Sequence, residues 1–421
     1  MKNILWTGIS CIALLFVSCG KPSVATGGDQ VIDVGAAMSH VATLTASDYF
    51  RKAQYVALET TDSCLIGNEP VVLIIKDRIL ITTAQKQALL FDKTTGRFIR
   101  SIGHVGEDPK GYSDARCHVD EKEGLFYFRG WHNDLVCYDS DGDYRGTIRM
   151  PVSTGGNSLL ISDYLNKDTL VNYYTSLTGS DTSKVQFFNA SGEVLNVVSN
   201  YRQGPAFGIS DVGNISVFDG ETAVKKFGRV GMEGVVVIRF KDTEMNSVWF
   251  GGSSYFWHQG EKTCFKEPFN DTIFVLTGTT LTPDRILNLG NYHWDYAERF
   301  RKNKDGNIYP TQFIEGEDFL FFRFITGLYS DDNRKLYDAV YNKATGEVKI
   351  GWTNDGLTDD LTGFLAFRPT TVSASGEYAG LIPIEDIHAW FDEHDTNGIS
   401  AEVLKLKQLK EDDNPVVVFY K

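Results

Sequence analysis

Positive charge is scarce in this chain of 421 residues. Lysine and arginine together number 41 against 55 aspartate and glutamate residues, which gives a formal net charge of −14. The sequence has no run of basic residues and no stripe in which basic and aromatic residues alternate. Because proteins bind nucleic-acid phosphates through clustered lysine and arginine, a nucleic-acid partner is not expected.

Cysteine is also sparse, with six residues, and four of these lie beyond the first nineteen positions: Cys64, Cys117, Cys137 and Cys264. Cys117 and Cys137 fall on the first and third strands of one predicted sheet. Strands two places apart are separated by about 9.6 Å, whereas the Cα atoms of a disulfide lie within about 7 Å of each other. We therefore expect buried free thiols.

Familiar catalytic and metal-binding signatures are missing. There is no Gly-x-Ser-x-Gly motif and no recognisable Cys–His nucleophile pair. The glycine-rich "GHVGEDPKG" (103–111) leads into a strand rather than a helix, which indicates a loop and not a phosphate site. "DSDGD" (139–143) has its glycine too early for a calcium loop, and His118 and His132 lack metal-ligand spacing. The sequence predicts no catalytic residue, no metal site and no cofactor.

The first nineteen residues differ from the rest. One lysine precedes an apolar stretch over 4–17, which is shorter than the roughly 20 residues that cross a bilayer and fits a secretory signal. The end of this stretch, "LFVSC", resembles a bacterial lipobox. That resemblance implies removal of residues 1–18 and lipidation of Cys19, and hence a membrane partner in the cell envelope. We expect a flexible tether over 19–50; it has no acidic residue before Asp29, which favours a periplasm-facing position.

A short pattern recurs beyond the tether. An apolar run ends in Asp or Asn, a turn with glycine follows, and another strand begins. The markers Asp92, Asp139 and Asn189 follow one another at intervals of 47 and 50 residues, and Asn342 lies three further steps of 51 along. Asp and Asn open such turns by accepting backbone hydrogen bonds, and glycine closes them at positive φ. A period near 50 residues with four strands per unit is typical of a β-propeller.

The sequence therefore predicts an all-β domain over 51–421: a six-bladed β-propeller with four-stranded antiparallel blades. Residues 205–262 are less regular and hold either one stretched blade with an insertion, which we favour, or an additional blade, which would make seven. The C-terminal "NPVVVFYK" has a natural partner in "QYVALET" (54–60). We expect these two terminal strands to close the ring by pairing in one blade.

Several stretches resemble a family of Bacteroidota-type lipoproteins with a six-bladed propeller of the TolB/NHL-like kind. They are "YVALETT" (55–61), "LLFDKTTGRFIRSIGHVGEDPKGY" (89–112), "PFNDTIF" (268–274) and "EDDNPVVVFYK" (411–421). The family's usual "G-x-x-G-x-G-P-x-E-Y" is altered here, because Asp108 replaces a glycine and Gly111 replaces the glutamate. The resemblance implies a fold and an envelope location, and it carries no agreed activity.

Aromatic residues supply the candidate ligand-binding positions. Two stretches, "RGWHND" (129–134) and "VWFGGSSYFWH" (248–258), are rich in rings that could stack on sugars or peptides, or pack between blades. The candidates are Trp131, His132, Trp249, Tyr255 and Trp257.

Three functions remain open at this point. We favour a non-enzymatic, lipid-anchored module that binds a peptide, a glycan or an envelope protein. The alternatives are a calcium-dependent propeller hydrolase or lactonase, and a scaffold subunit of an outer-membrane assembly.

Overall fold

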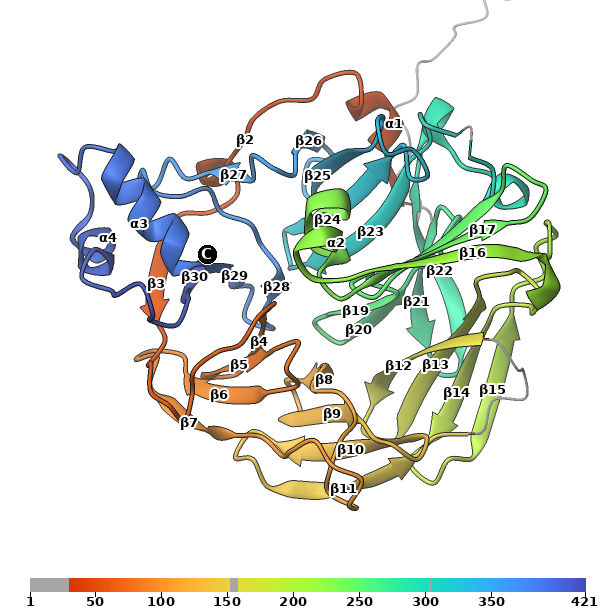
Figure 1. Cartoon of the computed structure of the whole chain (residues 1–421), viewed down its shortest axis with the longest axis horizontal. Coiled ribbons are helices and arrows are strands. Elements are labelled where there is room, and N and C mark those ends of the chain that lie inside the picture. The colour runs from red at the N-terminus through yellow and green to blue at the C-terminus, as the bar shows by residue number, and fades with distance from the viewer. Residues whose placement is uncertain (1–29, 152–157, 303) are drawn as a thin grey trace, which may run out of the picture.

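The computed structural model describes residues 30–151, 158–302 and 304–421. The signal segment 1–18 and Cys19 lie outside the described residues. Within them the chain is built almost wholly from antiparallel sheets, which stand around a common centre (Figure 1). This arrangement is propeller-like and confirms the predicted all-β class.

The first three sheets follow the predicted pattern. In each one, four consecutive strands pair with their neighbours in chain order. Sheet 1 contains β4 (Val71–Ile75), β5 (Arg78–Thr82), β6 (Ala88–Asp92) and β7 (Phe98–Ser101). Sheet 2 contains β8 (Cys117–Asp120), β9 (Leu125–Arg129), β10 (Asp134–Asp139) and β11 (Tyr144–Arg149). Sheet 3 contains β12 (Ser158–Asn166), β13 (Thr169–Ser176), β14 (Lys184–Asn189) and β15 (Val194–Ser199).

Three further sheets complete the arrangement. Sheet 4 contains β19 (Phe256–Gln259), β20 (Lys262–Phe265), β21 (Thr272–Thr277) and β22 (Thr280–Leu287). Sheet 5 contains β23 (Tyr309–Glu315), β24 (Phe319–Thr326), β25 (Lys335–Asn342) and β26 (Val348–Trp352). Sheet 6 contains β28 (Thr371–Val372), β29 (Tyr378–Ile382), β30 (Val416–Tyr420) and β3 (Ala53–Ala57). The C-terminal strand β30 pairs antiparallel with β3 from the other end of the chain, as the sequence predicted.

The irregular stretch forms a separate three-stranded sheet, which we call the inserted sheet. Its strands are β16 (Val212–Phe218), β17 (Val235–Phe240) and β18 (Asn246–Phe250). Helix α2 (Gly220–Phe227) connects the first two strands and buries Phe227 beside Phe250. Helices α3 (Ile384–Glu393) and α4 (Ala401–Leu406) lie between β29 and β30 in the chain. A 3₁₀ turn at Tyr296–Glu298 lies between β22 and β23.

The tether expected over 19–50 is not flexible where the structure describes it. Strand β1 (Gln30–Ile32) pairs parallel with β22, and helix α1 (Val34–Ala37) follows directly. Strand β2 (Leu44–Thr45) then pairs with β27 (Leu357–Thr358). This segment runs along sheets 4 and 5 because Ile32, Val34 and Leu44 bury their apolar side chains there. Residues 30–50, which the sequence assigned to the tether, are therefore part of the described fold.

The repeated turns have the predicted chemistry. Asp92 Oδ1 accepts the backbone N–H groups of Thr94 and Thr95, and Asn342 Oδ1 accepts those of Ala344 and Thr345. The closing glycines have positive φ, at +69° in Gly96 and +76° in Gly346. Glycine occupies this left-handed region without the steric cost that a Cβ would bring.

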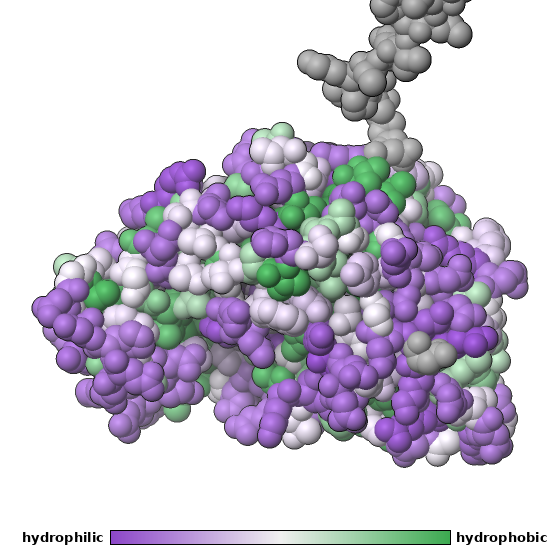
Figure 2. Space-filling model, turned by 90° about the horizontal axis from the view of Figure 1, so that it is seen from above, coloured by the Kyte–Doolittle hydropathy of each residue, from purple (hydrophilic) through white to green (hydrophobic). Residues whose placement is uncertain are grey.

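The core lies between neighbouring sheets rather than inside one of them. Buried clusters join sheets 1 and 2, sheets 3 and 4, sheets 4 and 5, sheets 5 and 6, and sheets 6 and 1. At one such interface the ring of Trp257 stacks on Phe313 at 4.6 Å. The face shown in Figure 2 is mostly hydrophilic with small scattered apolar patches. The negative net charge of the chain also favours solubility.

Candidate functional site

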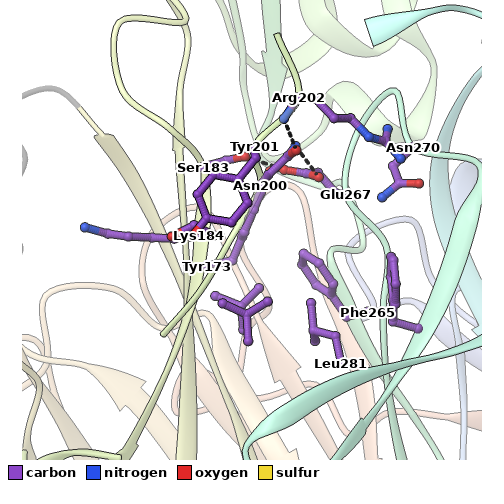
Figure 3. Close-up of a pocket in the computed structure, with 14 residues that line it drawn as sticks. Tyr173, Ser183, Lys184, Asn200, Tyr201, Arg202, Phe265, Glu267, Asn270 and Leu281 are labelled. Carbon is purple, nitrogen blue, oxygen red and sulfur yellow. Dashed lines mark hydrogen bonds between the residues drawn. The ribbon is translucent and has the colours of Figure 1, made fainter. Parts of the chain in front are cut away.

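A pocket of about 290 Å³ opens between sheets 3 and 4, and we call it the main pocket (Figure 3). A smaller cavity of about 50 Å³, the side pocket, adjoins it. The two share Tyr173, Ser183 and Glu267 as lining residues. Glu267 is the centre of this shared group, because Tyr173 and Ser183 both donate hydrogen bonds to its carboxylate.

A tight turn from Glu267 to Asn270 connects β20 to β21 and forms one wall. The N–H of Asn270 donates to the Glu267 carbonyl at 3.2 Å, and Asn270 Oδ1 accepts the N–H of Thr272 at 3.1 Å. Phe269 has φ of +58°, a conformation that a bulky residue adopts only when its surroundings enforce it. Its ring is held 5.2 Å from the rings of both Trp294 and Tyr309. The turn is thus a strained but well-supported element at the edge of the cavity.

The Glu267 side chain is almost fully buried, with 6% exposure, and receives donors from sheet 3. Its Oε1 accepts the hydroxyls of Ser183 and of Tyr173, the latter at 3.2 Å. Its Oε2 accepts Asn200 Nδ2 at 2.7 Å. Burial, followed by the nearby Glu267 carboxylate, raises the pKa of Tyr173 well above its usual range, so this hydroxyl stays protonated and donates.

Two cations, Arg202 and Lys266, lie near Glu267 without an ion pair to its carboxylate in the described part of the chain, whereas the Lys184 side chain points away from it (Figure 3). Arg202 Nη1 donates to the Phe269 carbonyl at 2.9 Å. The Lys184 ammonium lies 5.3 Å from the centre of the Tyr174 ring. Burial lowers the pKa of Lys266 to about 8, and its Nζ donates to the Glu267 carbonyl at 3.4 Å.

The base of the main pocket is apolar. Its lining side chains from both sheets are Val185, Val198, Phe265, Phe274 and Leu281. Tyr201 lines the same pocket and has 82% exposure, so most of its ring faces solvent. A cavity with an apolar base and a few polar groups at one end is the usual form of a small-ligand site.

Two of the five sequence candidates reach this region. Trp249 on β18 and Tyr255 line the side pocket, where the ring of Tyr255 lies 5.4 Å from that of Tyr173. Trp257 lines neither pocket: it is 7% exposed and its Nε1 donates to Glu315 Oε2 at 2.7 Å. Trp257 therefore packs between sheets 4 and 5, which is the second of the two roles that the sequence left open for these rings.

The other two candidates lie on sheet 2, in the loop between β9 and β10. Trp131 is 48% exposed; its Nε1 donates to the Tyr112 carbonyl at 3.2 Å, and Lys86 Nζ lies 5.9 Å from the ring centre. The backbone N–H of His132 donates to Asp134 Oδ1 at 3.3 Å. Neither residue lines the main or the side pocket.

The sequence reasoning missed Glu267 and Asn270, although they border or belong to the quoted stretch "PFNDTIF". In the sequence analysis that stretch only supported the family resemblance and supplied no candidate site residue. The available signal was the charged pair Lys266–Glu267 placed between a buried strand and a Pro-Phe-Asn turn. Charged residues next to a short hairpin are common, so only their convergence with Tyr173, Ser183 and Asn200 identifies a site.

A second polar cluster joins three strands that face the centre of the arrangement. Asp163 on β12 lies 3.0 Å from His258 Nε2 on β19 and 3.6 Å from His118 Nδ1 on β8. The His258 ring stacks on Tyr164 at 4.1 Å. Burial opposes ionisation of Asp163, yet the two imidazoles hold its pKa below the usual range. No group of three His, Cys, Asp or Glu residues in the described chain has an arrangement that could hold a metal ion.

The four cysteines among the described residues are free thiols, as expected, and three of them are buried while Cys117 is partly exposed. Cys117 and Cys137 stand on β8 and β10, with β9 between them. Among residues 30–151, 158–302 and 304–421, no helix is long and apolar enough to cross a membrane.

Comparison with known proteins gives a family and a fold. Residues 29–421 match the model of a family described as "Domain of unknown function (DUF4934)". The crystal structure of a candidate exported protein from Bacteroides fragilis NCTC 9343 is similar with a TM-score of 0.57 at 15% identity, covering 93% of this chain and 99% of that one. The WD40 repeats of RRP9 align with a TM-score of 0.37 at 8% identity over 90% of this chain and 99% of that one. No curated protein matches the sequence.

Proposed function

This chain belongs to the DUF4934 family of unknown function, and from that premise we propose that it is an exported envelope protein that binds a small glycan in the main pocket. A single observation carries the proposal. The pocket combines a buried carboxylate, amide side chains and an arginine above an apolar base with aromatic rings. Sugars present both hydroxyl groups and apolar C–H faces, so they fit such a mixture of groups.

The proposed scaffold is a six-bladed propeller of the TolB/NHL-like kind. Its support is the sequence of contacts among the first strands of the six sheets: β4 contacts β8, β8 contacts β12, β19 contacts β23, β23 contacts β28, and β28 contacts β4. The hydrogen bond between His258 and Asp163 joins β19 to β12. In this proposal residues 205–262 are an insertion that carries the inserted sheet. An experimental structure with β16–β18 as a seventh blade in the ring would contradict it.

The proposed anchor is the lipidated Cys19, with the folded domain facing the periplasm. The first described residues lie on sheet 4 through β1, so a lipid-linked segment would approach the domain there. The proposed binding role needs no enzymatic step. Access to the pocket from solvent is provided at its rim, where Tyr201 is exposed.

The test is a thermal-shift screen of the purified domain against mono- and disaccharides, with peptides as a parallel panel. A ligand that binds the folded state raises the apparent stability by about 2.7 kcal/mol at a concentration of 100 Kd. The Tyr201→Ala variant should lose the shift, because it removes the exposed ring at the rim. Trp131→Ala is the matched control, since it removes an exposed ring outside the pocket. If peptides and no saccharide raise the stability, the glycan proposal is wrong.

A further inference from the structure

We infer that the main pocket recognises a carboxylate group on its ligand, so that the glycan it binds contains a uronic acid. This inference rests on the proposed function and names the ligand class. Two unused hydrogen-bond donors at one end of the pocket, on Asn270 and Arg202, point to it.

The amide of Asn270 is the first donor. This residue is 6% exposed and lines the main pocket. Its Oδ1 accepts the backbone N–H of Thr272, which identifies the oxygen because an N–H cannot donate to the amide nitrogen. Asn270 Nδ2 is thereby left with no partner among the described residues. The Nδ2 atom is accessible from the pocket rather than sealed off, so a ligand acceptor can take the place of water at this position.

The guanidinium of Arg202 is the second donor. One of its N–H groups is used by the carbonyl of Phe269, the residue directly before Asn270. The backbone N–H of Arg202 donates to Asn200 Oδ1 at 2.8 Å, which ties its main chain to the same network. Arg202 forms no ion pair with any carboxylate in the part of the chain that the structure describes. Its remaining N–H groups are thus free to bind a planar anion, and a guanidinium fork matches a carboxylate.

The carboxylate of Glu267 does not compete for these donors, because three neutral groups already serve it. Tyr173 and Ser183 donate to Oε1, and Asn200 donates to Oε2 (Figure 3). An ionised carboxylate has about four acceptor positions, so Oε2 can still accept a ligand hydroxyl. The pocket is therefore complementary to a ligand that has an anionic group at one end and hydroxyl donors nearby. A hexuronic acid has both, whereas the C-terminal carboxylate of a peptide has no adjacent hydroxyl groups.

The test compares hexuronic acids with their neutral parents. Isothermal titration of the wild-type domain with glucuronic and galacturonic acid, and with glucose and galactose, should show at least about tenfold tighter binding of an acid than of its parent hexose. A sulfated hexosamine is titrated as a third ligand, to test whether the pocket prefers a sulfate to a carboxylate. Binding of the acid should weaken as the ionic strength is raised, because the contact with Arg202 is electrostatic.

Two variants localise the effect. Arg202→Ala should lose about tenfold or more in affinity for the acid and leave the affinity for the neutral hexose unchanged. Asn270→Asp keeps the acceptor for Thr272 and replaces the free donor by a negative oxygen, so it should also reject the acid. Arg97→Ala is the control, because Arg97 is an exposed arginine in the β6–β7 turn, away from the pocket. This variant should bind the acid with the affinity of the wild type.

Each other outcome overturns the inference. Equal binding of acid and neutral hexose, tighter binding of the sulfated sugar, or an unchanged affinity in Arg202→Ala would each show that carboxylate recognition is wrong while glycan binding stands. If no saccharide binds in any arm, the inference and the proposed function both fail.

Discussion

The imidazole of His258 lies 3.0 Å from the carboxylate of Asp163, so one polar contact joins the first strand of sheet 4 to that of sheet 3. His118 approaches the same carboxylate from sheet 2 at 3.6 Å. Sheets 2, 3 and 4 are therefore linked through a single buried side chain, although His258 stands 95 residues beyond Asp163 in the chain.

Replacing Asp163 by Asn should lower the free energy of unfolding by about 2 kcal/mol near pH 7, the usual value for a hydrogen bond to a charged group. The pKa of Asp163 is lowered in the folded state, so its contribution is present above the unfolded value of about 3.9 and is lost as the pH falls through the folded value. Urea unfolding from pH 3 to pH 8 tests this. A difference between wild type and variant that grows toward pH 3 would contradict it.

A buried ion pair between Arg285 and Glu315 joins sheets 4 and 5. The guanidinium donates to Oε1 at 2.7 Å and to Oε2 at 2.9 Å, and the indole of Trp257 also donates to Oε2. Glu315→Gln removes the carboxylate that Arg285 and Lys343 share and leaves the buried guanidinium only the partly exposed Asp284, so it should cost about 3 kcal/mol. Arg285→Met combined with Glu315→Leu should cost less than the single variant, because the two most deeply buried charges are removed together and only the partly exposed Asp284 and Lys343 lose a partner. Denaturant midpoints of the three proteins measure the difference.

Two glycines at equivalent turns should differ in their tolerance of alanine. Both have positive φ, and a Cβ at Gly96 would collide with the Ala57 carbonyl oxygen, whereas a Cβ at Gly346 meets nothing within 4 Å. Gly346→Ala should cost about 1–2 kcal/mol from backbone strain alone. Gly96→Ala should cost more, because the neighbouring strand β3 must also move. Equal melting temperatures for the two variants would contradict the steric argument.

Lys266 is a buried ammonium whose weak hydrogen bond does not compensate for its loss of water. Burial lowers its pKa to about 8, which is below the unfolded value of about 10.4. The penalty is therefore greatest below pH 8 and disappears as the pH rises above the unfolded value. Lys266→Met should stabilise the domain by roughly 1–3 kcal/mol at pH 7. The gain should shrink at pH 10; thermal melts at the two pH values check the sign.

Cys19→Ala should release the protein from the membrane fraction into the soluble periplasm, because the proposed acyl chains could no longer be attached. Cell fractionation with immunoblotting measures the change, and Cys64→Ala, which alters a buried thiol in the folded domain, is the control. Membrane association that persists in Cys19→Ala would show that the anchor lies elsewhere.

Local information in the sequence was enough for the sheets and turns. The alternation of short apolar runs with Asp/Asn-x-x-Gly turns predicted twelve strands of sheets 1–3, and the pairing of β3 with β30 followed from two apolar strands at opposite ends. These features depend on residues close together in the chain or on strongly apolar strands. The same local view failed for residues 30–50, which contain no turn of the repeat but bury Ile32, Val34 and Leu44 along sheets 4 and 5.

The sequence alone determined the all-β class, the repeat length and the residues that build each turn, because hydrogen bonds and φ preferences within a few residues decide them. The candidate site was decided by tertiary structure. Glu267 is identified as a site residue only because Tyr173, Ser183 and Asn200 donate hydrogen bonds to its carboxylate. These three residues belong to another sheet and stand 67 to 94 residues earlier in the chain. The aromatic content of a stretch could not tell which rings are exposed. Trp257 is buried between sheets and Tyr201 is exposed at the rim, because exposure depends on how the sheets pack against each other.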